Sequence, residues 1–240
     1  MKRFAGILLS AALVLSLASC GGKSEETPAP PTQGETTAAQ QVETSALAPE
    51  ISAELQSKND KTLVVYFSRV GNTDFPSDID AVSSATLSRR DGELKGNAQL
   101  MAEWMADEAD GDLFEIQTET SYPIDYTETT DVAKQEQNAG ARPALKSHIE
   151  GFDSYSTVYL VFPNWWADLP MALYSFFDEY DFTGKTLYVS ITHEGSSFSR
   201  TVSTIQSLEP DALVIEGLSI RGASVADSES TVRQFVQDNQ

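Results

Sequence analysis

Four short runs of apolar residues stand out along the chain, and none of them alternates with polar residues. They cover residues 63–67, 158–162, 187–191 and 212–215. Continuous apolar runs of this length are typical of strands that are buried on both faces, as in parallel sheets. A fifth run, residues 113–116, mixes polar and apolar side chains and predicts an edge strand.

Between these runs the apolar residues recur at helical spacing. Leu100, Met101, Trp104 and Met105 predict one face of a helix that starts near Asn97. Three further helices are predicted over residues 171–177 after Pro170, over residues 202–208 with Ser199 as N-cap, and over residues 232–236. Strands that alternate with helices in this way predict one doubly wound α/β domain over residues 59–240, a sheet with helices on both faces.

The first segment differs in composition and predicts export. Lys2 and Arg3 precede an apolar run and then small residues, so residues 1–19 read as a signal peptide. Residues 17–20, Leu-Ala-Ser-Cys, resemble the lipobox of bacterial lipoproteins, which implies lipidation of Cys20 and an extracytoplasmic, lipid-anchored protein at the cell membrane. An ordinary signal in which Cys20 is incidental is the alternative. Residues 20–58 are poor in aromatics and predict a disordered tether.

Charge and cysteine count narrow the range of functions. The formal net charge of −20 argues against a nucleic-acid partner, because no basic cluster offsets it. Cys20 is the single cysteine, so no intrachain disulfide or cysteine-rich zinc site can form. Two histidines leave little material for a metal centre, and no Ser/His/Asp set with plausible spacing indicates hydrolysis. We therefore predict no metal ligands and no catalytic side chains.

Candidate chemistry lies where the predicted strands end, because ligands of such sheets bind beyond the carboxyl ends of the strands. A turn rich in hydroxyls and glycine follows the first strand and could cradle a phosphate. A paired-tryptophan loop follows the third strand and could cover an aromatic ring. A Gly/Ser loop follows the fourth strand and would let backbone approach that ring. The residues of the three loops are Ser68, Arg69, Val70, Gly71, Asn72 and Thr73, then Pro163, Asn164, Trp165 and Trp166, then His193, Glu194, Gly195 and Ser196.

These loops resemble those of the flavodoxin-like family, in its short bacterial branch, over roughly residues 60–240. The resemblance implies a three-layer sandwich with a five-stranded parallel sheet of order 2-1-3-4-5 and non-covalently bound FMN. It implies that the 68–73 turn holds the FMN phosphate, while the 163–168 and 193–197 loops flank the isoalloxazine ring.

The sequence departs from the family pattern in two places. Val70 stands where the family usually has threonine, so one hydroxyl is missing. Residues 74–95 are inserted before the helix, which follows a second Gly-Asn pair at Gly96, Asn97 and Ala98. We expect the insertion to loop out over the surface, with Ser68 and the N–H groups near Asn97 and Ala98 sharing the phosphate. If one turn alone binds it, the helix dipole favours Gly96-Asn97.

Three functions remain open at this point. The first is electron transfer by FMN at the outer face of the cell membrane, to a redox partner protein or a small electron acceptor. The second is an FMN-dependent reductase of quinones or similar small aromatics, and the third is a flavodoxin-like module without cofactor. Glu194 is a candidate for lowering the flavin potential through its charge, and His193 for a hydrogen bond to flavin or substrate. Each of these two side chains could equally have only a structural role in the loop that carries it.

Overall fold

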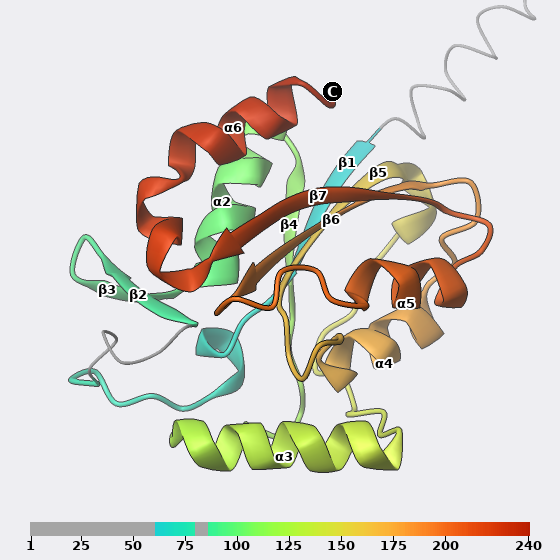
Figure 1. The fold of residues 1–240 in the computed structure, drawn as a ribbon. Helices are drawn as coiled ribbons and strands as arrows, with labels where there is room; N and C mark the ends of the chain where they lie inside the picture. The colour runs from blue at the N-terminus through green and yellow to red at the C-terminus, as the bar shows by residue number, and fades with distance from the viewer. Residues whose placement is uncertain (1–60, 80–85) are drawn as a thin grey trace, which may run out of the picture. The chain divides into compact units, whose positions relative to one another are not determined.

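The computed structural model describes residues 61–79 and 86–240 of the protein (Figure 1). The predicted signal peptide, the lipidation site Cys20 and the tether up to residue 58 lie outside the described residues. Within the described ranges, no helix has the length and apolar character needed to cross a membrane.

A five-stranded parallel sheet forms the centre of the domain, in the order β4-β1-β5-β6-β7. This is the predicted order 2-1-3-4-5, with β4 at the edge as its mixed sequence indicated. The central strands are buried because their runs are apolar on both faces. The strands are β4 (Asp112–Ile116), β1 (Lys61–Phe67), β5 (Tyr155–Pro163), β6 (Thr186–His193) and β7 (Leu213–Arg221).

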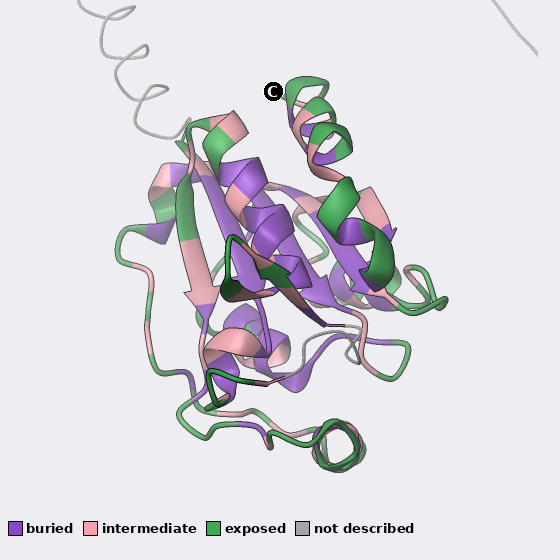
Figure 2. Ribbon diagram, turned by 90° about the vertical axis from the view of Figure 1, so that its left-hand side faces the viewer, coloured by how far each residue is buried: buried purple, intermediate pink, exposed green. Residues whose placement is uncertain are grey.

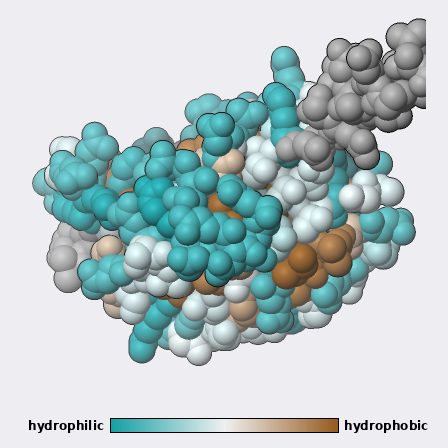
Figure 3. All heavy atoms as spheres, turned by 90° about the horizontal axis from the view of Figure 1, so that it is seen from above, coloured by the Kyte–Doolittle hydropathy of each residue, from teal (hydrophilic) through white to brown (hydrophobic). Residues whose placement is uncertain are grey.

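Helices cover both faces of the sheet (Figures 1 and 2). α2 (Asn97–Ala109) and α6 (Glu229–Gln237) pack on one face, and α4 (Met171–Glu179) and α5 (Thr201–Leu208) pack on the other. The predicted apolar face of α2 is buried, with Met101 and Met105 fully enclosed. α6 buries Val232 and Val236, and Figure 3 shows a largely hydrophilic surface on its outer side. The fold class predicted from the sequence is confirmed.

One helix departs from the layered arrangement. α3 (Tyr126–Ala139) begins at the N-cap Asp125, whose side chain accepts a hydrogen bond from the N–H of Glu128, and ends at Gly140 with φ +58°. It lies away from the sheet in both ribbon views (Figures 1 and 2). Only Thr129 and Ala133 of this helix are buried, because its sequence has no apolar stripe to pack on a sheet.

The insertion forms structure that the sequence reading did not predict. Its second half is an antiparallel hairpin of β2 (Leu87–Arg90) and β3 (Glu93–Gly96), which turns at Asp91 and Gly92. Arg90 connects the hairpin to α6 by an ion pair with Glu229 at 2.6 Å. The expected surface loop is therefore an ordered arm for residues 86–96, and its last residue is the N-cap of α2.

Two further predictions about element ends need correction. Ser199 is not the N-cap of α5: it has φ +49° and donates its hydroxyl to the carbonyl of Ser196, and Arg200 precedes the helix. β7 extends to Arg221, six residues past the predicted apolar run. The sequence signal ended early because Glu216, Gly217 and Ser219 interrupt the apolar run within β7. Two short 3₁₀ segments, η2 (Phe152–Ser154) and η3 (Gly222–Asp227), complete the connections.

Candidate functional site

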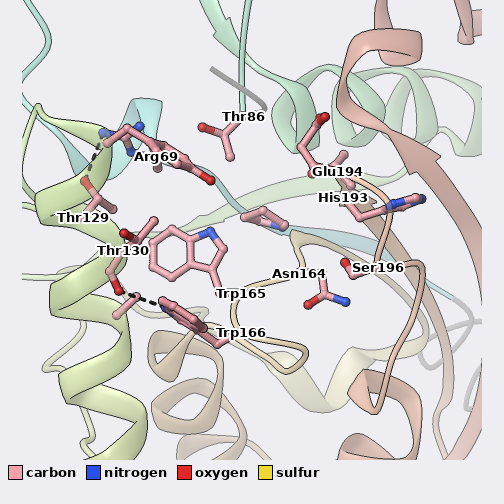
Figure 4. A pocket seen from close by; sticks show the side chains of 14 residues that line it. Arg69, Thr86, Thr129, Thr130, Asn164, Trp165, Trp166, His193, Glu194 and Ser196 are labelled. Atoms are coloured by element: carbon pink, nitrogen blue, oxygen red, sulfur yellow. Dashed lines mark hydrogen bonds between the residues drawn. The ribbon is translucent and has the colours of Figure 1, made fainter. Parts of the chain in front are cut away.

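A cavity of about 340 Å³ opens at the carboxyl ends of the strands, between α3 and the loops after β1, β5 and β6 (Figure 4). Its position agrees with the general rule for doubly wound sheets. Eight predicted site residues line it: Arg69, Pro163, Asn164, Trp165, Trp166, His193, Glu194 and Ser196. The structure thus brings the three loops together. The other predicted site residues do not line the cavity itself: Ser68, Val70, Gly71, Asn72, Thr73, Gly96, Asn97, Ala98 and Gly195.

The first Gly-Asn turn is a short 3₁₀ helix, η1 (Val70–Asn72), and its asparagine serves the fold. The buried Asn72 amide donates to the carbonyl oxygens of Ser68 at 2.8 Å and Ile116 at 2.9 Å. Its oxygen accepts from the N–H and the hydroxyl of Thr118 at 2.7 and 3.1 Å. Every polar atom of this side chain is engaged, so Asn72 joins β1 to β4.

A carboxylate occupies the space beside the same turn. A Cβ built on Gly71 would lie 1.9 Å from a carboxylate oxygen of Glu115. Burial is the main cause that raises the pKa of Glu115, while hydrogen bonds from Gln117 and Tyr66 oppose that shift. The negative carboxylate and the engaged Asn72 both disfavour a phosphate at Gly71.

The second Gly-Asn pair offers better anion chemistry. Gly96 is the N-cap of α2, and a Cβ built on it would lie 1.8 Å from the Ser68 hydroxyl oxygen. The Gly96 N–H donates to the Gln99 side chain and the Asn97 N–H donates to the carbonyl of Thr86. The N–H of Ala98, in the first helical turn, has no acceptor within the helix. The Ser68 hydroxyl and the start of α2 therefore lie together, which is required if the two are to share a phosphate.

Arg69 does not point into solvent. Its side chain is 2% exposed, and Nη2 donates to the carbonyls of Pro123 and Ile124 and to the hydroxyl of Thr129, at 3.0–3.1 Å. The guanidinium also lies over the rings of Phe75 and Tyr126. Burial lowers the pKa of Arg69, and nearby Tyr126 and Asp125 partly offset this effect. Arg69 thereby joins the first turn to the start of α3.

The two tryptophans play different parts in the cavity. Trp165 packs edge-on against Phe67 and Tyr122, with ring centroids 5.3 and 5.2 Å away. Trp166 is half exposed and donates its indole N–H to the carbonyl of Thr130 at 2.9 Å, a bond drawn in Figure 4. Trp166 has φ +53°, a strained value for a bulky residue. The loop thus carries one ring inward and attaches the other to α3.

Asp168 fixes the loop after β5 that carries Trp165 and Trp166. It is 3% exposed, and its carboxylate accepts from Arg200 Nη2 at 2.7 Å and from the hydroxyls of Tyr174 and Thr204 at 3.0 Å. Its backbone exchanges two hydrogen bonds with Trp165 at 3.0 Å. Burial first and the Asp168 charge second raise the pKa of Tyr174 to about 12, so its hydroxyl stays protonated. Asp168 holds Trp165 and Trp166 in place through α4 and α5.

The loop after β6 forms the opposite wall. His193 Nδ1 accepts from the N–H of Gly195 at 2.8 Å, which places the ring proton on Nε2, and in Figure 4 the ring points away from Trp165. Glu194 is 3.6 Å from Arg221 at the end of β7. Asn164 donates to the carbonyl of Ser197 at 2.7 Å, and its amide oxygen is buried without a partner. The loop after β5, which carries Asn164, therefore presents an unused acceptor beside the cavity.

Six lining residues were not predicted from the sequence: Thr86, Tyr126, Thr129, Thr130, Ala133 and Thr192. Four of them recur on α3 at spacings of three, one and three residues, which is one helix face. The sequence signal for these four residues is hydroxyl-bearing and small side chains that recur at helical spacing. A search for apolar stripes misses such a helix face. Within the described residues, no group of three His, Cys, Asp or Glu could hold a metal ion.

The fold and cavity define a doubly wound α/β protein with a ligand crevice at its strand ends. A family model described as Flavodoxin matches residues 92–239, more than half of the chain, so the protein belongs to the flavodoxin family. The match begins after the 68–73 turn. No curated protein sequence matches the chain.

Solved structures share the fold. A protein of Bacteroides uniformis named as a candidate flavoprotein has 28% identity and a TM-score of 0.56, over 75% of this chain and 99% of its own. A similarly named protein of Bacteroides eggerthii has 24% identity and a TM-score of 0.52, over 72% and 98%. A flavoprotein of Lactobacillus acidophilus in complex with FMN has 18% identity and a TM-score of 0.50, over 70% and 97%.

Proposed function

We propose that this protein binds FMN in the cavity and transfers electrons to a partner at the outer face of the cell membrane. The observation that carries the proposal is the Ser68 hydroxyl against the bare Gly96 at the start of α2. A hydroxyl beside a helix N-terminus suits a phosphate, and it lies near a cavity walled by tryptophans. When bound, FMN supplies one- and two-electron chemistry.

The residues present fit the two ends of such a ligand. Ser68 Oγ accepts from the Val70 N–H at 3.2 Å, so its own proton is available for an anion. Ala98 adds an N–H from the first turn of α2. At the other end Trp165 and Trp166 offer apolar surface to a flat ring, and the orphaned oxygen of Asn164 suits a ring N–H.

Exposed apolar side chains near the cavity favour a protein as electron acceptor. Tyr126 and Trp166 line the cavity and are 50% and 47% exposed, and Ile124 beside them is 49% exposed. Exposed apolar groups that gather in one place mark interaction sites more often than scattered ones do. A small aromatic substrate would not need them, which is why we place electron transfer ahead of quinone reduction.

The experiment is an absorption spectrum of the protein purified without residues 1–20, before and after adding FMN. We expect a bound flavin spectrum and a rise in melting temperature that grows with FMN concentration, because a ligand of the native state stabilises it. A protein that stays colourless and gains no stability would instead be a flavodoxin-like module without cofactor. Rapid oxidation of a nicotinamide cofactor with added quinone would favour the reductase.

Membrane attachment is tested separately on the full chain. We expect a labelled fatty acid to be incorporated into the wild type and not into Cys20→Ala, with the wild type in the membrane fraction. Lys2, Arg3 and the apolar run of the signal are unchanged in this variant, so we expect export itself to continue. Export without label in the wild type would identify an ordinary signal peptide and contradict the anchor.

A further inference from the structure

α3 forms one wall of the cavity but makes few apolar contacts with the rest of the described chain. Thr129 and Ala133 are its buried residues, and Val132 is the partly buried apolar side chain that packs against the core. α2, a helix of similar length, buries eight residues. Elements with few buried apolar contacts open locally at low free energy, and lids over ligand sites are drawn from such elements. The packing of α3 is therefore that of an element able to move.

The chain enters and leaves α3 through a narrow neck. Residues 117–119 and 144–146 form an isolated antiparallel bridge, with backbone hydrogen bonds of 2.9 and 2.8 Å. The start of α3 is also held, because Arg69 Nη2 donates to the carbonyls of Pro123 and Ile124. The helix ends at Gly140 with φ +58°. Hinges are a few residues at the ends of elements, and this neck and helix start have that arrangement.

Trp166 holds α3 beyond the hinge. Its indole N–H donates to the carbonyl of Thr130 at 2.9 Å, and its own carbonyl accepts from the Gln137 side chain at 3.4 Å. Lys134 Nζ lies 5.0 Å from the centre of the indole ring. Figure 4 shows the Trp166 ring directed at α3. Water competes for these polar groups because Trp166 is half exposed, so the contacts can break and re-form.

The backbone that carries this indole is strained. Trp166 and Ala167 have φ +53° and +62°, and Trp165 and Asp168 exchange two hydrogen bonds across them. Positive φ at both central residues is the pattern of a type I′ turn, which favours Asn-Gly. Strained backbone persists where the surroundings fix it, and it clusters at ligand clamps and switch regions. Asn-Gly would relieve the strain here but would remove the ring that reaches α3.

We propose that α3 is a lid on the cavity, that it tilts about its start, and that Trp166 is the latch that holds it closed. The lid goes beyond the proposed function, because it applies to any ligand of this cavity. At about 340 Å³ the cavity is near the lower end of the usual range for ligand pockets. A ligand that fills it touches α3 and the tryptophan loop together, so the two must separate before it can leave.

Hydrogen exchange of the flavin-free protein, purified without residues 1–20, tests the lid directly. In the wild type, amides 130–139 should exchange faster than those of α2, because a detached helix as short as α3 is marginally stable in water. Trp166→Phe keeps a ring and loses the indole N–H. It should raise exchange at 130–139 by about fivefold or more, the equivalent of one hydrogen bond. Residues 117–119 and 144–146 should keep the wild-type rate.

A second variant separates a latch from a merely structural residue. Trp166→Asn/Ala167→Gly gives the turn its preferred residues and removes the ring. We expect α3 to exchange still faster than in Trp166→Phe, with a melting temperature no lower than that of Trp166→Phe. Arg90→Gln, which breaks the ion pair joining the β2–β3 hairpin to α6, is the matched control and should leave α3 unchanged.

FMN is the probe for ligand passage, followed by stopped-flow flavin fluorescence. Loosening a latch speeds both opening to admit a ligand and opening to release it, so Trp166→Phe should raise the association and dissociation rates together. Loss of a direct contact with the ligand would raise the dissociation rate alone. That second result would make Trp166 a binding residue and overturn its role as a latch.

Two exchange results also overturn the lid. One needs no variant: wild-type α3 amides that exchange no faster than those of α2. The other is an equal rise in α2, the neck and α3 in Trp166→Phe, which indicates loss of global stability. Neither result depends on flavin. If FMN does not bind, the proposed function fails, and hydrogen exchange still decides whether α3 is a lid.

Discussion

The hydroxyl of Ser68 lies where a side chain on Gly96 would begin: a Cβ there would be 1.8 Å from Ser68 Oγ and 3.0 Å from Ser68 Cβ. The two residues are 28 positions apart in the sequence, on either side of the insertion. A hydroxyl that follows β1 can approach the backbone at the start of α2 this closely only because residue 96 is glycine.

Gly96→Ala should therefore drive the Ser68 hydroxyl out of its position. We expect a loss of about 1–3 kcal/mol in the free energy of unfolding, the usual cost of overpacking, and weaker FMN binding. Chemical denaturation and flavin titration measure the two effects. In the double variant Ser68→Gly/Gly96→Ala the space returns, so stability should recover in part while FMN binding should not. If Gly96→Ala binds FMN as tightly as the wild type, Ser68 does not contribute to phosphate binding.

Asp168 should control the tryptophan loop through its charge. In Asp168→Asn an amide N–H₂ group must face either the Thr204 hydroxyl or both Arg200 and Tyr174, so at least one donor loses its acceptor. We expect a loss of about 2 kcal/mol in unfolding free energy and a change in tryptophan fluorescence. Asp178→Asn, which alters an exposed pair with Arg142, is the matched control and should leave fluorescence unchanged. Equal small effects in both variants would contradict this role.

Glu209, at the end of α5, gives a pH prediction. Burial first, and then the charges of Asp181 and Asp178, raise its pKa from 4.5 to about 7. The native state thus binds more protons than the unfolded state between these two pH values, so Glu209 makes stability fall as pH rises through that window. Glu209→Gln should be more stable than the wild type at pH 8, by about 1 kcal/mol after discounting for solvent screening, and equal to it near pH 4.

Thermal unfolding across that pH range measures the difference. Glu150→Gln, an exposed carboxylate outside α5, controls for net charge and should shift stability little at any pH. A constant difference between Glu209→Gln and the wild type at all pH values would show that the carboxylate is not the cause.

The sheet and most of its helices could be predicted from the sequence because their signals are local. The apolar runs of β1, β5 and β6 and the apolar face of α2 are each contained in a few consecutive residues. α3 could not be placed this way. Its cavity face consists of Tyr126, Thr129, Thr130 and Ala133, and small polar residues at helical spacing do not tell whether the face meets a sheet, solvent or a ligand.

The loops that form the site could be predicted from the sequence, but the contacts that their residues make could not. The role of Asn72 depends on the carbonyl of Ile116 and on Thr118, which β4 brings within reach from more than 40 positions away. The direction of Arg69 likewise depends on where α3 begins. Long-range pairings of this kind leave no local pattern, so the sequence identified the residues at strand ends and could not assign them to ligand or to fold.

Glu194 and Arg221 form a pair of opposite charges beside the cavity, at 3.6 Å, and both are substantially exposed. If FMN binds there, the Glu194 carboxylate disfavours the negative charge that reduction adds to the flavin. Glu194→Gln should therefore raise the reduction potential of the flavin. Arg221→Gln should lower it. We expect shifts on the order of tens of mV, because the opposite charge and solvent screen each group. Spectroelectrochemical titration measures them, with Glu216→Gln on β7 as control. The double variant should lie near the wild type, and shifts of the same sign in both single variants would show that loop conformation, not charge, sets the potential.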